Sequence, residues 1–249
     1  MIGVIPARYA SQRLPGKPII DLLGTPLIQR VYEQAKKSKL LHRILVATDD
    51  PRIEKTVLQF GGEVIMTSTQ IACGSDRVAA VAEQIEGDIF VNIQGDEPLI
   101  SPEMIDQGAQ LLIDDSSIPV GTLVKELDSI DDLWNPNVVK VVVNTNGCAL
   151  YFSRSVIPYL RDEIDTKKWL QHHRYFKHIG LYVYRKEFLS QYPKLSPSKL
   201  ECTEKLEQLR ILENGYSIKV GVTSFDSIPV DTIEDVQKVI ELIKQRDLT

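Results

Sequence analysis

The first half of the chain alternates between short β-branched runs and helix patterns. The runs cover residues 2–5, 44–47, 63–66 and 88–93. Between them, Thr25-Pro26, Asp50-Pro51 and Ser101-Pro102 each join a capping residue to a proline at the first helical position, which predicts helices over 27–37, 52–60 and 104–113. Strands that alternate with helices of about ten residues predict parallel βαβ units with right-handed crossovers. The expected fold is α/β, with a doubly wound and mostly parallel sheet.

The second half is richer in strands. Asn146-Gly147 separates runs at 138–144 and 149–152 and predicts a hairpin, and further strands are expected at 180–184 and 217–222. Helices are expected at 204–213 and, after the capping pair of Thr232 and Asp235, at 232–244. A break in the pattern near residue 115 predicts a mixed-sheet lobe inserted within a single domain, 1–249, with halves 1–115 and 116–249. The polar stretch 161–173 is expected to be a mobile loop.

Composition narrows the possible partners. The 249 residues carry a formal net charge of −5, so nucleic acid and anionic membranes are not expected to bind in bulk. An anionic ligand therefore needs a local cationic cluster. The three cysteines form no CxxC pattern, which favours free thiols in a reducing compartment. The chain has no run of ~18 apolar residues and no secretory signal pattern, so we expect a cytoplasmic location.

A cationic loop follows the first predicted strand. The segment IPARYASQRLPGKP, residues 5–18, contains Arg8, Arg13 and Lys17, with Gly16 allowing close backbone approach. Ligands of open α/β sheets bind beyond the carboxyl ends of the strands, where this loop must lie. The cations and free N–H groups predict a cradle for a nucleoside triphosphate. The loop matches neither the Walker pattern nor GxGxxG.

Carboxylates follow two other predicted elements. The run VNIQGDEP, residues 91–98, displays Asp96 and Glu97 after a buried strand, and Asp231 precedes the last helix. One or two carboxylates together with phosphate oxygens are what Mg²⁺ prefers, so Asp96 and Asp231 are candidate metal ligands. The alternatives are a plain capping turn at Asp96 and, at Asp231, an acidic residue favoured by the helix dipole.

Two further groups suit a nucleotide base and an acceptor. Gly74, Ser75 and Arg77 open a predicted helix, where small residues and N–H groups can approach a base or ribose, or can simply cap the helix beside a surface arginine. Later in the chain, His178 precedes a strand, and Glu207 with Gln208 lies on a polar helix face. These side chains can bind hydroxyl groups, or they can be structural and solvated.

Taken in order, these segments resemble the 3-deoxy-manno-octulosonate (KDO) cytidylyltransferase family over essentially the whole chain. The matching segments are IPARYASQRLPGKP, VATDDPRI, MTST, GSDRV, VNIQGDEP, ALYFSRSVIP, HIGLYVYR, EKLEQLR and VDTIEDV. The resemblance implies a glycosyltransferase-A-like nucleotidyltransferase fold and a homodimer. It also implies that CTP and KDO react to give CMP-KDO and pyrophosphate, for lipopolysaccharide biosynthesis.

The resemblance also implies roles for individual residues. Arg13, Lys17 and Asp96 would be catalytic, with Asp96 and Asp231 holding Mg²⁺. The residues implied in nucleotide binding are Arg8, Arg13, Lys17, Gly74, Ser75, Arg77 and Gln94. The residues implied in sugar binding are Arg154, His178, Tyr182, Glu207 and Gln208, with Arg154 pairing with the sugar carboxylate.

One segment departs from the family pattern. The family often has His-x-Ser before the helix that contacts the base, whereas this chain has Ile71-Ala72-Cys73. A related sugar acid, such as 8-amino-KDO or an acylneuraminate, therefore stays open as the acceptor. A non-catalytic nucleotide-binding regulator is the alternative from another class. The presence of Lys17 with both candidate metal carboxylates argues against it.

Overall fold

The structure, a computed structural model, describes residues 1–10, 14–71, 73–226 and 228–246. The chain divides into two compact units. The first unit comprises Met1–Asp106 and Asp226–Thr249, and the second unit comprises Gln107–Phe225. The C-terminal segment thus belongs to the unit in which the chain begins.

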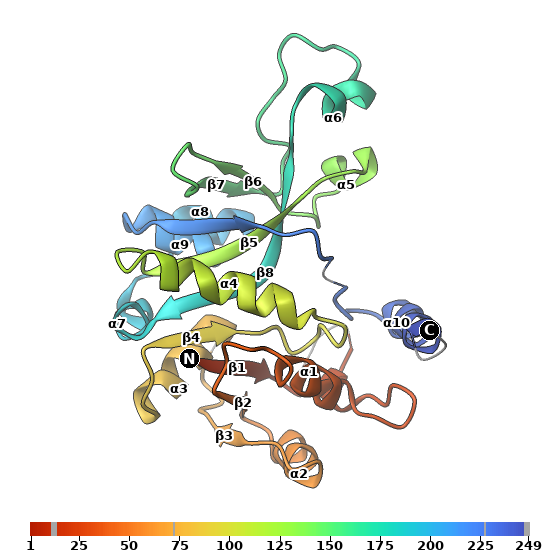
Figure 1. The fold of residues 1–249 in the computed structure, drawn as a ribbon, viewed down its shortest axis with the longest axis vertical. Coiled ribbons are helices and arrows are strands. Elements are labelled where there is room, and N and C mark those ends of the chain that lie inside the picture. Colours follow the sequence, from red (N-terminus) through yellow and green to blue (C-terminus); the bar gives the residue numbers. More distant parts are fainter. Residues whose placement is uncertain (11–13, 72, 227, 247–249) are drawn as a thin grey trace. The chain divides into compact units, whose positions relative to one another are not determined.

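The first unit is built on four parallel strands in the order β3-β2-β1-β4 (Figure 1). The strands are β1 (Ile2–Ala7), β2 (Arg43–Thr48), β3 (Val64–Met66) and β4 (Ile89–Asn92). The helices that connect them are α1 (Leu27–Ala35), α2 (Pro51–Gln59) and α3 (Gly74–Gln84). This arrangement confirms the parallel α/β fold expected from the sequence.

The strand order contains a reversal of direction. The chain steps outward from β1 to β2 and β3, and then β4 forms on the opposite side of β1. Right-handed crossovers therefore place α1 and α2 on one face of the sheet and α3 on the other. The reversal lies between β1 and β4. Ligands of such sheets bind beyond the carboxyl ends of the strands at this point.

Local sequence explains why these helices form. The Asp50 carboxylate accepts the Arg52 N–H at 2.9 Å and so caps α2, and Pro51 takes the first helical position, as expected from the sequence. In α1, Leu27, Ile28 and Val31 are fully buried. Burial stabilises by roughly 1.5–3 kcal/mol for each such side chain, which fixes the helix on the sheet.

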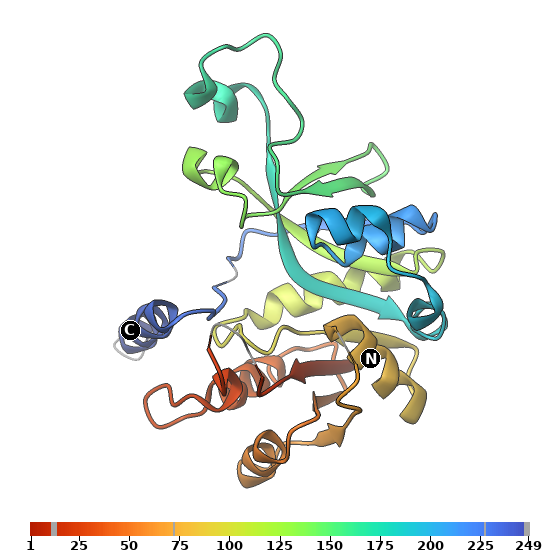
Figure 2. The ribbon, with the colours of Figure 1, turned by 180° about the vertical axis from the view of Figure 1, so that it is seen from behind.

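The second unit contains a mixed sheet, as the sequence predicted (Figure 2). In it, β5 is antiparallel to β8 and parallel to β9, and β6 is antiparallel to both β7 and β8. The strands are β5 (Val120–Glu126), β6 (Lys140–Val143), β7 (Ala149–Ser153), β8 (Phe176–Arg185) and β9 (Ile218–Val222). The hairpin of β6 and β7 confirms the Asn-Gly signal, whereas β5 was not among the predicted strands.

Two helical segments differ from expectation. The helix predicted over 204–213 is shorter and begins at Gln208, because Lys205 adopts a left-handed conformation with φ 56° and ends a separate, preceding helix at Glu204. The polar stretch 161–173 contains a short helix whose Trp169 is 1% exposed and stacks on Tyr175. The remaining helices are α4 (Pro102–Asp114), α5 (Ile130–Trp134), α6 (Trp169–His172), α7 (Lys186–Leu189), α8 (Lys199–Glu204), α9 (Gln208–Glu213) and α10 (Ile233–Arg246). Across the part of the chain that the structure describes, no helix has the length and apolar content needed to span a bilayer.

Candidate active site

The loop after β1 is closed by its own backbone. The Gly16 N–H donates to the Tyr9 carbonyl at 2.9 Å, and the Lys17 N–H donates to the Leu14 carbonyl at 3.2 Å. Gly16 has φ +72°, and a Cβ on it would lie 3.2 Å from the Tyr9 ring, so glycine suits both the conformation and the space. The guanidinium carbon of Arg52 lies over the Tyr9 ring, 3.2 Å from its centre. The main chain at Lys17 is therefore fixed.

The Lys17 ammonium bridges two carboxylates. Nζ lies 2.7 Å from Asp96 Oδ2 and 3.2 Å from Asp231 Oδ1. The side chain of Lys17 is 14% exposed, whereas those of Asp96 and Asp231 are 26% and 33% exposed. One cation thus joins the loop after β1, the loop after β4 and the segment before α10.

Backbone contacts place the two aspartates. A Cβ on Gly95 would lie 2.5 Å from the Pro6 carbonyl oxygen. The loop after β4 therefore approaches the end of β1 so closely that only glycine fits at position 95. The Val230 N–H donates to the Asp96 carbonyl at 2.9 Å and ties the second carboxylate segment to the first. The positions of Asp96 and Asp231 are therefore set mainly by the main chain.

Asp235 fixes the other end of the Asp231 segment. Its Oδ2 accepts the N–H groups of Asp231 and Thr232, each at 2.9 Å, and Thr232 Oγ1 accepts the Asp235 N–H in return. This is the capping pair predicted for the last helix. Burial alone raises the pKa of Asp235, but the donated hydrogen bonds outweigh it and hold that pKa below its ordinary value.

The first turn of α3 is anchored by a buried arginine. Arg77 is fully buried, and its Nη2 lies 2.9 Å from Asp49 Oδ2 while Nη1 donates to the Thr67 hydroxyl. The alternative interpretation of Arg77, as a surface arginine beside a simple helix cap, is therefore wrong. At the helix start, Cys73 is the N-cap, and its thiol accepts the Asp76 N–H at 3.4 Å. The cysteine at which this chain differs from the family pattern therefore caps α3 through its sulfur.

Several buried polar atoms near this turn lack protein partners. Among the described residues, Arg77 Nε, Asp76 Oδ1 and Asn92 Oδ1 are buried without a hydrogen bond. Asn92 lies at the end of β4, and its Nδ2 lies 3.8 Å from where a Cβ on Gly74 would be. Buried polar groups are normally paired, so these atoms are available to a ligand or to water. Sequence reasoning missed Asn92, and the signal was an amide at the end of an otherwise apolar strand.

The two bridged carboxylates have the composition of a partial magnesium site. Within the described residues no group of three or more His, Cys, Asp or Glu side chains is gathered to hold a metal. Mg²⁺ needs only one or two carboxylates when phosphate oxygens and water complete its octahedron. A cation, the Lys17 ammonium, already lies between Asp96 and Asp231. The donor set therefore fits Mg²⁺ that arrives with a phosphate ligand.

In the second unit, β8 brings His178 and Tyr182 together. Their ring centres lie 5.2 Å apart, and His178 Nε2 is 3.1 Å from the Thr122 hydroxyl. That hydroxyl has one proton and lies 2.8 Å from the Leu181 carbonyl, so His178 donates through Nε2 and its Nδ1 keeps a lone pair. Burial lowers the pKa of His178 to about 3 and raises that of Tyr182. Both side chains are neutral hydrogen-bonding groups at physiological pH.

The other predicted sugar residues lie around α8 and α9. Glu207 is exposed, and the negative charge of its carboxylate adds to the rise in the Tyr182 pKa that burial causes. Gln208 is 6% exposed, and its Nε2 has no hydrogen bond within the described residues. Arg154 is held differently, because its Nε donates to the Glu204 carbonyl at 2.7 Å and its Nη1 to the Pro136 carbonyl at 3.0 Å.

The remaining predicted residues occupy the expected elements of the first unit. Arg8 is half-buried directly after β1, and Gln94 is half-buried directly after β4. Gly74 and Ser75 form the start of α3. Arg13 lies outside the described residues.

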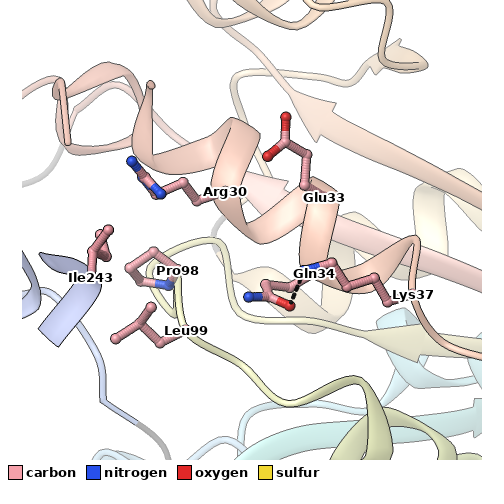
Figure 3. Close-up of a pocket in the computed structure, with 7 residues that line it drawn as sticks. All are labelled: Arg30, Glu33, Gln34, Lys37, Pro98, Leu99 and Ile243. Atoms are coloured by element: carbon pink, nitrogen blue, oxygen red, sulfur yellow. Dashed lines mark hydrogen bonds between the residues drawn. The ribbon is translucent and has the colours of Figure 1, made fainter. Parts of the chain in front are cut away.

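A separate hollow of about 390 Å³ lies elsewhere on the first unit (Figure 3). Arg30 in its wall donates to the Leu22 carbonyl, and Lys37 donates to Gln34 Oε1 at 3.2 Å. The lining comes from α1, the segment after β4 and α10. Those lining residues are Arg30, Glu33, Gln34, Lys37, Pro98, Leu99 and Ile243, so none of the predicted site residues contributes to it.

Comparison with known proteins places the chain. A family model described as cytidylyltransferase matches residues 2–220. A 3-deoxy-manno-octulosonate cytidylyltransferase of Geotalea daltonii is 52% identical, with 98% of each chain covered. One of Parabacteroides distasonis is also 52% identical, again with 98% of each chain covered. The chain belongs to the 3-deoxy-manno-octulosonate cytidylyltransferase family.

Solved structures agree with this family membership. A CMP:2-keto-3-deoxy-manno-octonic acid synthetase in complex with CTP is 44% identical, covers 98% of each chain and superimposes with a TM-score of 0.92. An inositol-1-phosphate CTP transferase from T. maritima has a TM-score of 0.68 at 18% identity, with 98% of this chain and 94% of its own covered. The latter shares the fold, which is the nucleotidyltransferase fold expected for the family.

The close approach of Gly95 to β1 yields the first prediction. Gly95→Ala should destabilise the protein by about 1–3 kcal/mol, because the new methyl group meets a backbone oxygen that cannot rotate away. The matched control is Gly74→Ala, where the nearest atoms would lie 3.8 and 3.9 Å from the Cβ and little change is expected. Urea denaturation measures both free energies of unfolding. Equal stability of the two variants would contradict the packing at Gly95.

The half-buried imidazole of His178 yields a pH prediction. His178 has a pKa of about 6.5 in the unfolded chain and about 3 in the folded protein. Between these pH values the unfolded chain binds a proton at His178 and the folded protein does not. Stability should therefore fall with decreasing pH, by up to about 1.4 kcal/mol per pH unit from this group. Urea denaturation between pH 7.5 and 5 should show a shallower loss for His178→Gln than for the wild type. The exposed His173→Gln is the control and should follow the wild type.

Proposed function

We propose that this protein activates KDO by transferring a cytidylyl group from CTP, giving CMP-KDO and pyrophosphate for lipopolysaccharide biosynthesis. The observation that carries the proposal is the cation bridge of Lys17, Asp96 and Asp231, in a chain 52% identical to named KDO cytidylyltransferases. A relative 44% identical is named as a complex with CTP.

The residues of the first unit suit the chemistry at the α-phosphorus. Attack there places negative charge on the equatorial oxygens and on the departing pyrophosphate, and fixed cations stabilise that charge. Lys17 and Arg8 lie in the loop after β1, and Arg13 belongs to the same loop by sequence. Asp96 and Asp231 would hold Mg²⁺, which when bound polarises phosphate oxygens and lowers the pKa of a bound hydroxyl. Gln94, Gly74 and Ser75 are assigned to the nucleotide, and Arg77 is assigned to it through its support of α3.

The residues of the second unit suit a polyhydroxylated acid. His178 offers a neutral acceptor, Tyr182 a phenol, and Glu207 and Gln208 a carboxylate and an amide for sugar hydroxyls. Arg154 would pair with the sugar carboxylate through the part of its guanidinium that its carbonyl contacts do not use. The acceptor that we favour is KDO. The changed segment before α3 keeps 8-amino-KDO and an acylneuraminate as alternatives.

We place the reaction in the cytoplasm, where CTP is made available to nucleotidyltransferases. The described cysteines, Cys73, Cys148 and Cys202, are all free thiols, which supports a reducing compartment.

We further propose that the active form is a homodimer. The second unit carries several large apolar side chains that are well exposed, and an interface would remove part of that apolar area from water. They are Trp134 at 49%, Leu150 at 60%, Tyr159 at 75%, Ile164 at 96% and Val222 at 59% exposure. We expect a second copy of the chain to cover some of these side chains, Leu150 among them.

Leu150→Arg tests the dimer. Burying a charge in an apolar interface is unfavourable, so the variant should shift towards monomer in light scattering at micromolar concentration. The control is Leu58→Arg, because Leu58 is also 60% exposed but lies on α2 of the first unit. Equal masses for the wild type and both variants would contradict the proposal that Leu150 lies in the dimer interface.

Pyrophosphate release tests the activity itself. Purified protein with CTP and Mg²⁺ should release pyrophosphate with KDO, and the 8-amino analogue and sialic acid are tested alongside. Asp96→Asn should lower kcat by at least about 10²-fold, because the amide neither binds the metal well nor carries its charge. The exposed Asp114→Asn should keep full activity. Pyrophosphate release with sialic acid alone would contradict the assignment of KDO as acceptor. No pyrophosphate release with any of the three acids would contradict the proposal that the protein is an enzyme.

A further inference from the structure

Lys17 lies between the two carboxylates that would hold a metal ion. Its Nζ contacts an oxygen of each candidate metal ligand, at 2.7 Å for Asp96 and 3.2 Å for Asp231. An ammonium and a divalent cation that seek the same two oxygens cannot both be bound there, since each places positive charge at one point. The residue assigned to the phosphates is thus also a competitor of the metal.

We infer that Lys17 is an internal counter-ion that keeps the divalent cation weakly bound until nucleotide phosphates draw the lysine away. This inference rests on the proposed function, because it assigns an order of binding within that site. The metal then enters together with the nucleotide, and the released ammonium becomes a phosphate contact.

The local structure allows this exchange with little rearrangement. The Lys17 main chain is fixed by Gly16 and by the hydrogen bond to the Leu14 carbonyl, while its side chain is a flexible four-carbon stem. The two carboxylates are held through backbone contacts at Gly95, Val230 and Asp235 that do not involve Lys17. Lys17 can therefore leave while the carboxylates stay in place.

Charge gives the exchange its direction. Lys17 forms an ion pair with each of the two carboxylates, so a divalent cation entering alone must displace favourable ion pairs. Polyphosphate supplies a second anion for the lysine, and it also supplies oxygens that complete the metal octahedron. Nucleotide binding and metal binding should therefore be cooperative, and the coupling should depend on the charge at residue 17.

Binding of Mn²⁺ to the nucleotide-free protein tests the inference. Lys17→Met removes the competing charge but keeps a stem of similar length, and it should bind Mn²⁺ about tenfold more tightly than the wild type in electron paramagnetic resonance titrations. Lys17→Arg keeps the charge and should bind within about twofold of the wild type. The exposed Lys36→Met is the matched control and should leave Mn²⁺ affinity unchanged. Adding Asp231→Asn to Lys17→Met should abolish the gain.

A measurement on the wild-type protein covers the case in which Lys17→Met does not fold. Acylation of Lys17 by acetic anhydride, followed by peptide mass spectrometry, should rise severalfold with saturating Mn²⁺, because the metal releases the ammonium. Labelling of the exposed Lys36 should not change. Unchanged Lys17 labelling, or an unchanged Mn²⁺ affinity in folded Lys17→Met, would overturn the inference. If the wild-type protein still releases pyrophosphate, either of these outcomes overturns the role of Lys17 and leaves the proposed function intact. Failure of the inference can therefore be distinguished from failure of the proposed function.

Discussion

The ion pairs of Lys17 join three segments of the first unit that are far apart in the chain. Lys17 joins Asp96, which is 79 positions away in the chain, and Asp231, which is 214 positions away. Bringing such distant segments together costs loop-closure entropy, which buried contacts must offset. On α10 those contacts come from Val236, Val239 and Ile243, all nearly fully buried. The last helix therefore serves the site by carrying one carboxylate back to the unit in which the chain begins.

The charged atoms are placed chiefly by main-chain contacts. Gly95 brings one carboxylate segment against the Pro6 carbonyl, Val230 ties the other to the Asp96 carbonyl, and Asp235 caps the helix that follows. Such contacts are insensitive to which cation occupies the site. This separation of scaffold from charge is what lets an ammonium and a metal ion exchange without moving the carboxylates.

The sequence was sufficient for the parallel half of the fold and weaker for the inserted half. In the first half, a proline lies at or just before the start of α1, α2 and α4, so the type and order of these helices follow from local signals. In the second half, β5 was not predicted, because Val120–Glu126 is a mostly buried run whose apolar residues do not alternate with polar ones. Its partners β8 and β9 are remote in sequence, and periodicity cannot anticipate such pairing. The left-handed backbone conformation at Lys205 could not be predicted, because the residue that usually indicates it, glycine, is absent from that position.

Short motifs could identify the family but could not separate binding residues from scaffold. In EKLEQLR, Glu204 accepts from the Ser153 hydroxyl and the Arg154 N–H, and buried Arg210 pairs with Glu201 at 2.6 Å. Only burial and partners, which are properties of the folded chain, distinguish these residues from the exposed Glu207.

The same distinction changes the interpretation of Arg77. Arg77 has no exposed surface, and its Nη atoms donate to Thr67 and Asp49. Its guanidinium therefore anchors α3 to the segments that carry these two residues. We therefore expect recognition of the base to fall mainly to the first-turn backbone at Gly74 and Ser75, which Arg77 and Asp49 hold in position. A positively charged residue in a family motif can thus act through the helix that it supports, and its burial is the property that reveals this.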